Sequence, residues 1–240
     1  MSREIGFIGL GAMGKPMAIN LLKKKFSVTA FDIRPEPMIE VEQLGAKAAN
    51  YSREVAARCD VIITMLVSSP HVEAAVLGKD GVIEGIRPGS VLIDMSTIAP
   101  GVTKKVGAEL AKKGVEMLDA PVARGVKAAT DGTLAIFVGG KKEVFDKSKD
   151  ILEAMGTDVS YVGALGCGEV VKLVNQLILS VNVATIAEGL VLGVKGGVEP
   201  DVLFEVLGKG SANSFALQNH YKNFVMKGNF GENIFPTDYI

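Results

Sequence analysis

The feature that most constrains the fold of this chain is a repeated alternation of short apolar runs with helical segments, up to about residue 162. Parallel strands that are buried on both faces of a sheet are almost continuously apolar, and helices join one such strand to the next. The pattern predicts an α/β domain with a doubly wound parallel sheet. The apolar runs are EIGFIGL, SVTAFD, DVIITML, SVLIDM, VEMLDA, TLAIFVGG and DVSYVG, and the helical segments lie at 12–25, 35–44, 52–58, 100–113 and 141–154.

The pattern changes beyond the last of these runs, where no comparable strand follows. A long helix is predicted at roughly 166–195, and further helical patterns follow at 200–208 and 212–226. We therefore expect a sheet domain at 1–162 and an all-helical domain at 163–240, with the long helix joining the two.

The long helix is apolar on nearly every face over the segment GEVVKLVNQLILSVNVATIAEGL, residues 168–190. A helix of this kind is normally buried. It is also long enough to cross a membrane, but four polar residues interrupt it, so we interpret it as a core helix. These residues are Asn175, Gln176, Asn182 and Glu188.

Lys172 lies near the start of this apolar helix. Burying an unpaired ammonium group is costly, or it lowers the pKa of the amine. Asn175 and Gln176 lie three and four positions further on, on the same helical face, and are its expected partners. The alternative is a lysine at a helix end whose charged group extends to water.

The composition narrows the class of protein. The net charge of −1 and the pI near 6.2 provide no basic surface for nucleic acid or for an anionic membrane. Cys59 and Cys167 offer no disulfide framework, which favours a reducing cytoplasm, and together with His71 and His220 they do not make a metal site. The first strand pattern begins at the N-terminus, so we expect no signal peptide.

A glycine-rich turn follows the first apolar run, in the sequence GFIGLGAMGKPM. In this G-x-G-x-x-G spacing Gly9 permits a tight turn, Gly11 lets the backbone approach a pyrophosphate, and Gly14 lets helix and strand pack closely. Free N–H groups at the helix N-terminus favour phosphate. The turn predicts a dinucleotide-binding domain of the Rossmann type, with cofactor contacts from Gly9, Leu10, Gly11, Ala12, Met13 and Gly14.

Asp32 ends the second apolar run, 18 residues after Gly14, where a carboxylate accepts hydrogen bonds from both ribose hydroxyls. The same carboxylate repels a 2′-phosphate, which favours NAD over NADP. Arg34 would partly offset that repulsion, so NADP stays open; alternatively it is a surface arginine beside the adenine. Both residues are candidate cofactor contacts.

Three further strand ends are expected at the same edge of the sheet, where ligands of open α/β sheets bind. Met65 and Leu66 end one of them and are either cofactor contacts or core residues. Ser96 and Thr97 end the next, and they either cap the following helix or hold the nicotinamide ribose or the substrate. The third strand end is DAPVARG, residues 119–125.

Four motifs resemble those of the β-hydroxyacid dehydrogenase family in order and spacing, over essentially the whole chain. They are GFIGLGAMGKPMAINLL, DMSTIAP, DAPV…GTLAIFVGG and the segment from Gly166 to Gln176. The family includes 3-hydroxyisobutyrate dehydrogenases, and the motifs look most like those of its tartronate semialdehyde and glyoxylate reductases. The resemblance implies an NAD(P)-dependent oxidoreductase that transfers a hydride between the cofactor and a small acidic semialdehyde or β-hydroxy acid.

The resemblance also implies roles for single residues. Lys172 matches the catalytic lysine, which would give its proton to the developing alkoxide during aldehyde reduction. Asn175, with Gln176 beside it, matches the substrate-binding position, and Thr97 matches a cofactor contact. Burial should lower the lysine pKa toward the range that suits a general acid. We also expect a homo-oligomer, a dimer or tetramer, whose helical domain serves substrate binding and dimerisation.

The loop after DAPV departs from the Ser-Gly-Gly of the family. Here it consists of Ala123, Arg124 and Gly125, all of them candidate substrate contacts, the arginine through a guanidinium that suits an oxyanion. The arginine makes the loop resemble that of sulfolactaldehyde reductases. Alternatively Arg124 points to solvent and backbone groups hold the substrate.

The chain also stops at NIFPTDYI, where the family continues with a Lys-Asp-Leu segment, and we therefore expect a truncated chain. Two hypotheses from other classes stay open. One is a non-catalytic dinucleotide-binding module. The other is an imine reductase, which has this architecture but usually lacks the lysine.

Overall fold

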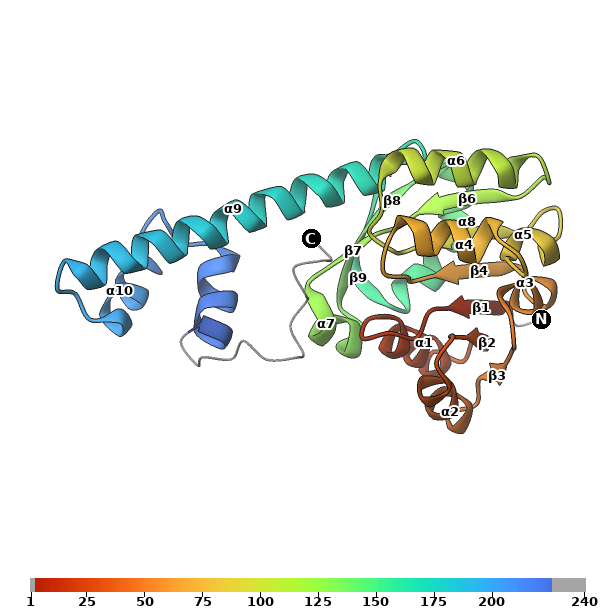
Figure 1. Cartoon of the computed structure of the whole chain (residues 1–240), viewed down its shortest axis with the longest axis horizontal. Helices are drawn as coiled ribbons and strands as arrows, with labels where there is room; N and C mark the ends of the chain where they lie inside the picture. Colours follow the sequence, from red (N-terminus) through yellow and green to blue (C-terminus); the bar gives the residue numbers. More distant parts are fainter. Residues whose placement is uncertain (1–2, 226–240) are drawn as a thin grey trace. The chain divides into compact units, whose positions relative to one another are not determined.

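The structure of the protein is a computed structural model that describes residues 3–225 (Figure 1). The chain divides into two compact units, residues 1–172 and residues 173–240. The helix α9 (Cys167–Lys195) contributes its first residues to the first unit and its remaining residues to the second.

The first unit contains a nine-stranded sheet. Its strands are β1 (Glu4–Ile8), β2 (Ser27–Phe31), β3 (Lys47–Ala48), β4 (Val61–Thr64), β5 (Val91–Asp94), β6 (Glu116–Asp119), β7 (Val122–Ala123), β8 (Leu134–Gly139) and β9 (Gly156–Gly163). The strand order is β3-β2-β1-β4-β5-β6-β8-β7, with β9 paired to β8. This is the doubly wound Rossmann arrangement that the sequence predicts.

The sheet is parallel from β3 to β6 and again between β8 and β9, but β8 is antiparallel to β6 and to β7. The expectation of a parallel sheet is therefore confirmed for most of its pairs and not for these two. The segment 124–133 between β7 and β8 is shorter than the crossover of roughly a dozen residues that a parallel connection needs. The chain returns in the opposite direction instead.

Eight helices of the first unit cover the two faces of this sheet (Figure 1). They are α1 (Gly14–Lys23), α2 (Pro35–Gln43), α3 (Ser52–Arg58), α4 (Ser69–Leu77), α5 (Val82–Gly85), α6 (Pro100–Ala111), α7 (Gly125–Asp131) and α8 (Lys142–Glu153). Residues of α1, α2, α7 and α8 share one core cluster, and residues of α3, α4, α5 and α6 share the other. Ile63 and Ile93 face the first cluster, whereas their strand neighbours Ile62 and Leu92 face the second. Burial on both faces explains the continuous apolar runs.

Five short elements escaped the sequence patterns: β3, β7, α4, α5 and α7. Each of these strands has two residues and each of these helices has between four and nine. The two strands and α5 are too short for a period to be visible, whereas α4 and α7 are as long as α2 and α3, which the sequence did predict. Their formation depends on the surfaces against which they pack.

The second unit contains most of α9, together with α10 (Pro200–Leu207) and the π-helix η1 (Ala216–Val225). Its described core is small. Leu190, Leu217 and Tyr221 are buried, and four half-buried apolar residues pack against them: Ile186, Leu203, Phe204 and Leu207.

The interpretation of the long helix as a buried core helix is wrong for the single chain. Within the apolar stretch of α9 only 6% of the residues are buried, and Leu177 and Leu192 are 65% and 74% exposed. By length and composition α9 also resembles a membrane-spanning helix. The apolar pattern is real, but the described residues of the second unit cover only a small part of it.

Candidate active site

The glycine turn has the geometry that its spacing predicts. Gly9 has a φ of +95°, and a Cβ atom there would overlap the carbonyl oxygen of Met65. A Cβ atom on Gly14 would overlap the carbonyl oxygen of Gly9, so helix α1 packs directly against the turn. A Cβ atom on Gly11 would meet only Arg34 Nη2, at 4.0 Å. The space beside Gly11 is therefore open for the close approach of a phosphate group.

Asp32 lies beside this turn and its side chain is 6% exposed. Its Oδ2 accepts a hydrogen bond from the N–H of Leu10 at 2.6 Å. Burial by itself would raise the pKa of Asp32, but hydrogen bonds from Arg34 and from the Leu10 N–H outweigh it and lower the pKa. The carboxylate is thus held ionised at the end of β2, where an acceptor for ribose hydroxyls belongs.

Arg34 is hydrogen-bonded to the carboxylate of Asp32. Its Nε donates to Asp32 Oδ1 at 3.1 Å and its Nη2 donates to Asp32 Oδ2 at 3.2 Å, while its own side chain remains 55% exposed. A ribose diol would have to displace these bonds. Arg34 Nη2 is also the nearest atom to a Cβ atom built on Gly11, so the guanidinium borders the open space beside the glycine turn.

The ends of β4 and β5 are joined by Ser96. Its hydroxyl donates to Asp94 Oδ1 at 2.6 Å and accepts a hydrogen bond from the N–H of Leu66 at 2.9 Å, and the residue is 0% exposed. The hydroxyl is therefore buried and already bonded, and a contact between Ser96 and the substrate stays a prediction. Met65, Leu66 and Thr97 are half-buried at the same strand ends, which leaves them accessible to a cofactor. Neither Ser96 nor Thr97 caps helix α6.

Lys172 is 8% exposed, which confirms the expected burial and excludes a lysine that extends to water. Burial lowers the pKa of its amine to about 8, and the nearby carboxyl of Glu169 partly opposes this shift. An amine with such a pKa exchanges its proton near neutral pH, as a general acid or base must.

Glu169 lies three positions before Lys172 and is 0% exposed. Its Oε2 accepts a hydrogen bond from the N–H of Ile98 at 3.2 Å, and this bond ties helix α9 to the loop after β5. Burial, followed by the charges of Asp94 and Asp119, raises the pKa of Glu169 to about 9. The carboxyl is therefore largely protonated at neutral pH.

Asp119 holds the start of helix α9 against the end of β6. Its Oδ1 accepts the N–H of Gly166 at 2.8 Å, and its Oδ2 accepts the N–H of Glu169 at 2.9 Å. Neither Gly139 nor Gly168 leaves room for a Cβ atom beside this carboxylate, so the contact requires glycine at both positions. Asp119 therefore holds the first residues of α9 in place, and α9 is the helix that carries Lys172.

Sequence reasoning missed these three acidic residues, Asp94, Asp119 and Glu169. A signal was present, because two carboxylates end otherwise apolar strand runs and the third lies one helical turn before Lys172. The partners expected instead, Asn175 and Gln176, belong to the second unit, where Asn175 Nδ2 donates to Gln176 Oε1 at 3.2 Å. Their contact with Lys172 or with a substrate stays a prediction.

The loop at 123–125 connects β7 to α7 and carries strain at Arg124, which has a φ of +86°. The Arg124 Nη1 donates to Asp158 Oδ2 at 2.6 Å and to the carbonyl oxygen of Thr133 at 3.1 Å. This surface ion pair gives the guanidinium a partner within the protein. A contact between Arg124 and a substrate stays a prediction, and it would have to compete with Asp158.

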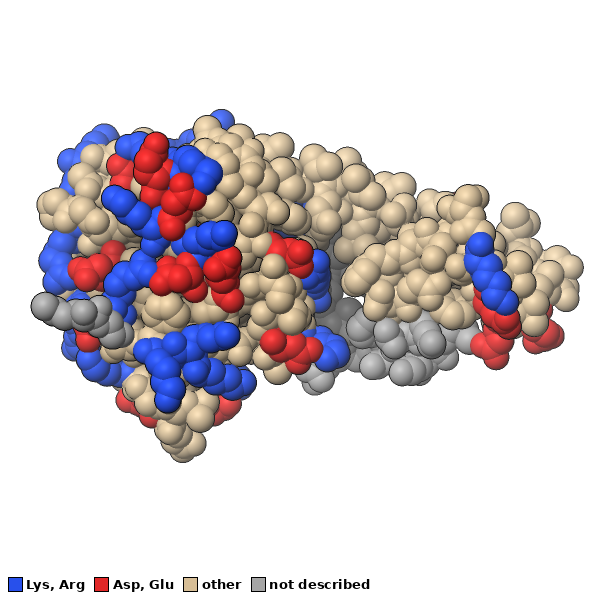
Figure 2. Space-filling view, turned by 180° about the vertical axis from the view of Figure 1, so that it is seen from behind, with Lys and Arg blue, Asp and Glu red and all other residues tan. Residues whose placement is uncertain are grey.

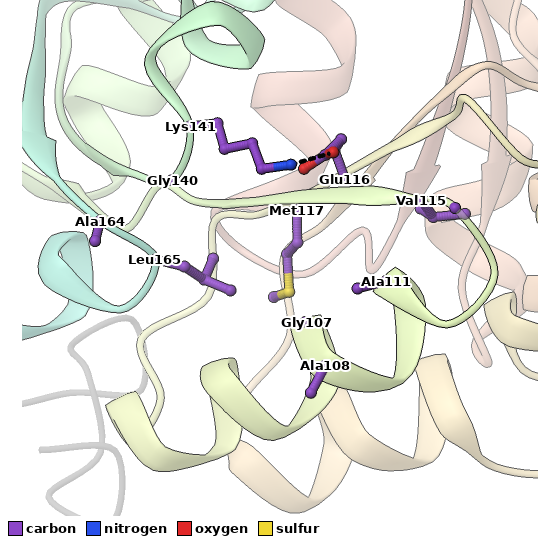
Figure 3. A pocket seen from close by; sticks show the side chains of 11 residues that line it. Gly107, Ala108, Ala111, Val115, Glu116, Met117, Gly140, Lys141, Ala164 and Leu165 are labelled. Carbon is purple, nitrogen blue, oxygen red and sulfur yellow. Dashed lines mark hydrogen bonds and ion pairs between the residues drawn. The ribbon is translucent and has the colours of Figure 1, made fainter.

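The first unit also has a cavity of about 510 Å³ between α6 and β6 (Figure 3). An ion pair between Lys141 and Glu116 at 2.6 Å lies at its edge. None of the predicted site residues lines the cavity. Among residues 3–225 no group of histidine, cysteine, aspartate and glutamate side chains could hold a metal ion.

The glycine turn, the acid at the end of β2 and the buried lysine together define an NAD(P)-dependent oxidoreductase. Residues 4–163 match the family model described as the NAD binding domain of 6-phosphogluconate dehydrogenase. Residues 166–238 match the model described as NAD-binding of NADP-dependent 3-hydroxyisobutyrate dehydrogenase. The chain belongs to the β-hydroxyacid dehydrogenase family, and it is a hydroxyacid dehydrogenase that uses NAD(P).

The relatives support this assignment. The chain is 44% identical to the 2-(hydroxymethyl)glutarate dehydrogenase of Eubacterium barkeri, over 95% of this chain and 76% of that protein. It is 42% identical to the 3-hydroxyisobutyrate dehydrogenase of Pseudomonas aeruginosa, over 89% and 72% of the two chains. A solved structure of Mycobacterium tuberculosis 3-hydroxyisobutyrate dehydrogenase with L-serine superposes with a TM-score of 0.85 at 34% identity, covering 91% of this chain and 74% of that one.

Proposed function

We propose that this protein interconverts a small β-hydroxy acid and the corresponding acidic semialdehyde with NAD(H), and that it uses NADP(H) less well. The observation that carries the proposal is the buried amine of Lys172, whose pKa is lowered to about 8. Three relatives act by their names on 2-(hydroxymethyl)glutarate, 3-hydroxyisobutyrate and L-serine. Each of these acids carries a hydroxymethyl group on the carbon that bears the carboxylate.

In this proposal separate residues bind the cofactor and transfer the proton. The turn at 9–14 holds the pyrophosphate, and Asp32 holds the adenosine ribose once Arg34 has turned away. The bound nicotinamide supplies or accepts the hydride. Lys172 handles the proton: its ammonium donates to the oxygen that becomes the hydroxyl, and its neutral amine accepts that proton in the oxidative direction.

The substrate needs two further contacts. We assign the hydroxyl-bearing end to Asn175 and Gln176, and the acidic end to the loop formed by Ala123, Arg124 and Gly125. The support for the second assignment is the guanidinium fork, which matches the geometry of a carboxylate or a sulfonate. A sulfonated aldehyde of the sulfolactaldehyde type is therefore the second candidate substrate.

A substrate screen tests the proposal. NAD reduction would be measured with 3-hydroxyisobutyrate, 2-(hydroxymethyl)glutarate and L-serine, and NADH oxidation with tartronate semialdehyde, glyoxylate and a sulfonated aldehyde. We expect turnover of at least one acidic substrate and little turnover of an uncharged aldehyde of similar length. Faster turnover of the uncharged aldehyde or of a cyclic imine would contradict the proposal. NADH binding without any turnover would indicate a dinucleotide-binding module.

We also propose that the protein works as a cytoplasmic homo-oligomer and binds neither nucleic acid nor a membrane. The support for an oligomer is the row of apolar side chains along α9, which are exposed to solvent in the single chain. On the face of the first unit that Figure 2 shows, basic and acidic side chains are interspersed, an arrangement that does not suit a polyanion. Light scattering at two protein concentrations would test the oligomer, sedimentation with liposomes would test the absence of membrane binding, and a gel shift with DNA would test the absence of nucleic-acid binding.

A further inference from the structure

Two buried carboxyl oxygens of the first unit lack a hydrogen-bond partner among the described residues: Asp94 Oδ2 and Glu169 Oε1. Both residues are 0% exposed. An ionised carboxylate oxygen that is buried without a donor is costly, so each of these atoms requires an explanation.

The other oxygen of each carboxyl is well bonded, and to the same short loop. Asp94 Oδ1 accepts hydrogen bonds from the hydroxyl of Thr64 at 2.8 Å and from the hydroxyl of Ser96 at 2.6 Å. Glu169 Oε2 accepts the N–H of Ile98 at 3.2 Å. The residues after Asp94 thus connect the two carboxyls, and the charge of Asp94 acts directly on Glu169.

Three buried carboxyls, those of Asp94, Asp119 and Glu169, cannot all be ionised at once. Burial raises the pKa of each of them, and the charges of Asp94 and Asp119 raise that of Glu169 further. Of the three, Glu169 is the one whose charge acts on Lys172. Asp119 is the member whose two oxygens both accept backbone N–H groups, at the N-terminus of α9, and it is therefore the best stabilised as an anion. Two neighbouring carboxyls that cannot both ionise share one proton instead.

We propose that Asp94 and Glu169 hold one proton between them, and that the single negative charge of this pair favours the protonated form of Lys172. One proton gives the two unpartnered oxygens a donor and an acceptor at the same time. Asp94 and Glu169 are then positioning residues that act through Lys172. The part of the inference that concerns catalysis rests on the proposed role of Lys172, whereas the shared proton does not.

The experiment changes the number of negative charges that the Asp94 and Glu169 pair carries. Glu169→Gln keeps an acceptor for the Ile98 N–H and places an amide donor toward Asp94, so it imitates the protonated glutamate. Asp94→Asn likewise keeps the acceptor for Thr64 and Ser96 and donates toward Glu169. Each single variant therefore retains one negative charge on the pair, and only the double variant removes the charge of the pair.

The first readout is the pH at which kcat/KM for aldehyde reduction falls as Lys172 loses its proton. We expect both single variants to keep this pH within about half a unit of the wild type, and the double variant to lower it by about one to two units. The matched control is Glu116→Gln, which removes an exposed charge from the Lys141 ion pair and should change nothing. A shift in each single variant would show two separate charges and overturn the proposal, as would an unchanged double variant.

The second readout needs neither activity nor the Asp94 variant. A protonated buried carboxylic acid has its own carbonyl band in isotope-edited infrared spectra. We expect that band in the wild type near neutral pH and its loss in Glu169→Gln, where Asp94 is ionised and residue 169 is an amide. A wild type without the band would overturn the shared proton. If no substrate is turned over while the band behaves as expected, the proposed function fails and the carboxyl pair stands.

Discussion

The two units of this chain differ in how much of their own apolar surface they bury. In residues 1–172 two apolar clusters fill both faces of the sheet, and side chains such as Ile63 and Ile93 are 0% exposed. In the described part of residues 173–240 only Leu190, Leu217 and Tyr221 form a buried cluster. The two units are about equally apolar in sequence pattern, so the difference lies in what surrounds each apolar residue.

This difference shows that an apolar sequence pattern indicates which side chains would be stabilised by burial. It does not indicate which other element or chain buries them. A parallel sheet with helices on both faces provides this burial within one unit. A single long helix cannot, because any two helices packed on it leave part of its circumference exposed. The chemistry follows the same division: the described ionisable groups with strongly shifted pKa values near the site lie in the first unit.

The largest effect on activity is expected for Lys172, the proposed proton donor of the first unit. Lys172→Ala should lower kcat by a general-acid factor on the order of 10²–10⁴ and leave NADH affinity nearly unchanged. Lys195→Ala, at the exposed end of the same helix in the second unit, is the matched control and should have little effect. Steady-state kinetics and NADH fluorescence titration measure both. An equal loss of NADH binding would assign Lys172 to the cofactor instead.

A pair of apolar truncations tests the difference in burial itself. Ile93→Ala removes a fully buried side chain and should lower the free energy of unfolding by about 2–5 kcal/mol. Leu192→Ala removes a side chain that is 74% exposed and should change it by less than about 0.5 kcal/mol in a monomer. Urea unfolding followed by circular dichroism would measure both. A large, concentration-dependent cost at Leu192 would show that a partner chain covers α9.

The predicted preference for NAD over NADP rests on two residues of the first unit, Asp32 and Arg34. If Asp32 holds the ribose diol, Asp32→Ala should weaken NADH binding by about 10- to 150-fold and bring the affinity for NADPH closer to that for NADH. Arg34→Ala frees the same carboxylate, so it should not weaken NADH and should weaken NADPH. Dissociation constants for both nucleotides in the three proteins test this. A wild type that prefers NADPH would contradict the assignment of Asp32.

The pH dependence of the reaction follows from the lowered pKa of Lys172, about 8. Reduction requires the protonated amine, so its kcat should fall about tenfold per pH unit above that value. Oxidation requires the neutral amine, so its kcat should rise with pH and level off above the same value. Profiles measured in both directions should therefore bend near one pH. A bend that persists in Lys172→Ala would belong to another group.

The smallest effect on KM is expected from changes to the ion pair of Arg124 with Asp158. Arg124 either binds the substrate or only stabilises the fold, and the two roles predict different results. If Arg124 binds the acidic end of the substrate, Asp158→Asn removes its competitor and should lower KM by about two- to five-fold. Arg124→Ala should then raise KM for an acidic semialdehyde and not for an uncharged aldehyde. If Asp158→Asn leaves KM unchanged while Arg124→Ala lowers only the unfolding temperature, the arginine is structural.

Much of the fold follows from local patterns. Every predicted strand run and every predicted helix in the first unit is found, because a period of two or of 3.6 residues is visible within a few positions of sequence. The roles of Gly9 and Gly14 were predictable for a similar reason, since a turn between a strand and a helix demands small residues at fixed spacing. The lowered pKa of Lys172 was predictable from its apolar neighbours alone.

The tertiary structure decided how distant residues meet. Asp94, Asp119 and Glu169 are separated by up to 75 positions. The strand order makes Asp94 and Asp119 register partners, and the hydrogen bonds of Asp119 to the N–H groups of Gly166 and Glu169 bring the start of α9 to the same strand end. The same order gives Ser96 its buried hydrogen bonds and gives Arg124 a carboxylate partner at Asp158. A sequence pattern reports which face of an element is apolar, because that depends on near neighbours. It does not report which polar groups converge, because that depends on how the elements are ordered in the sheet.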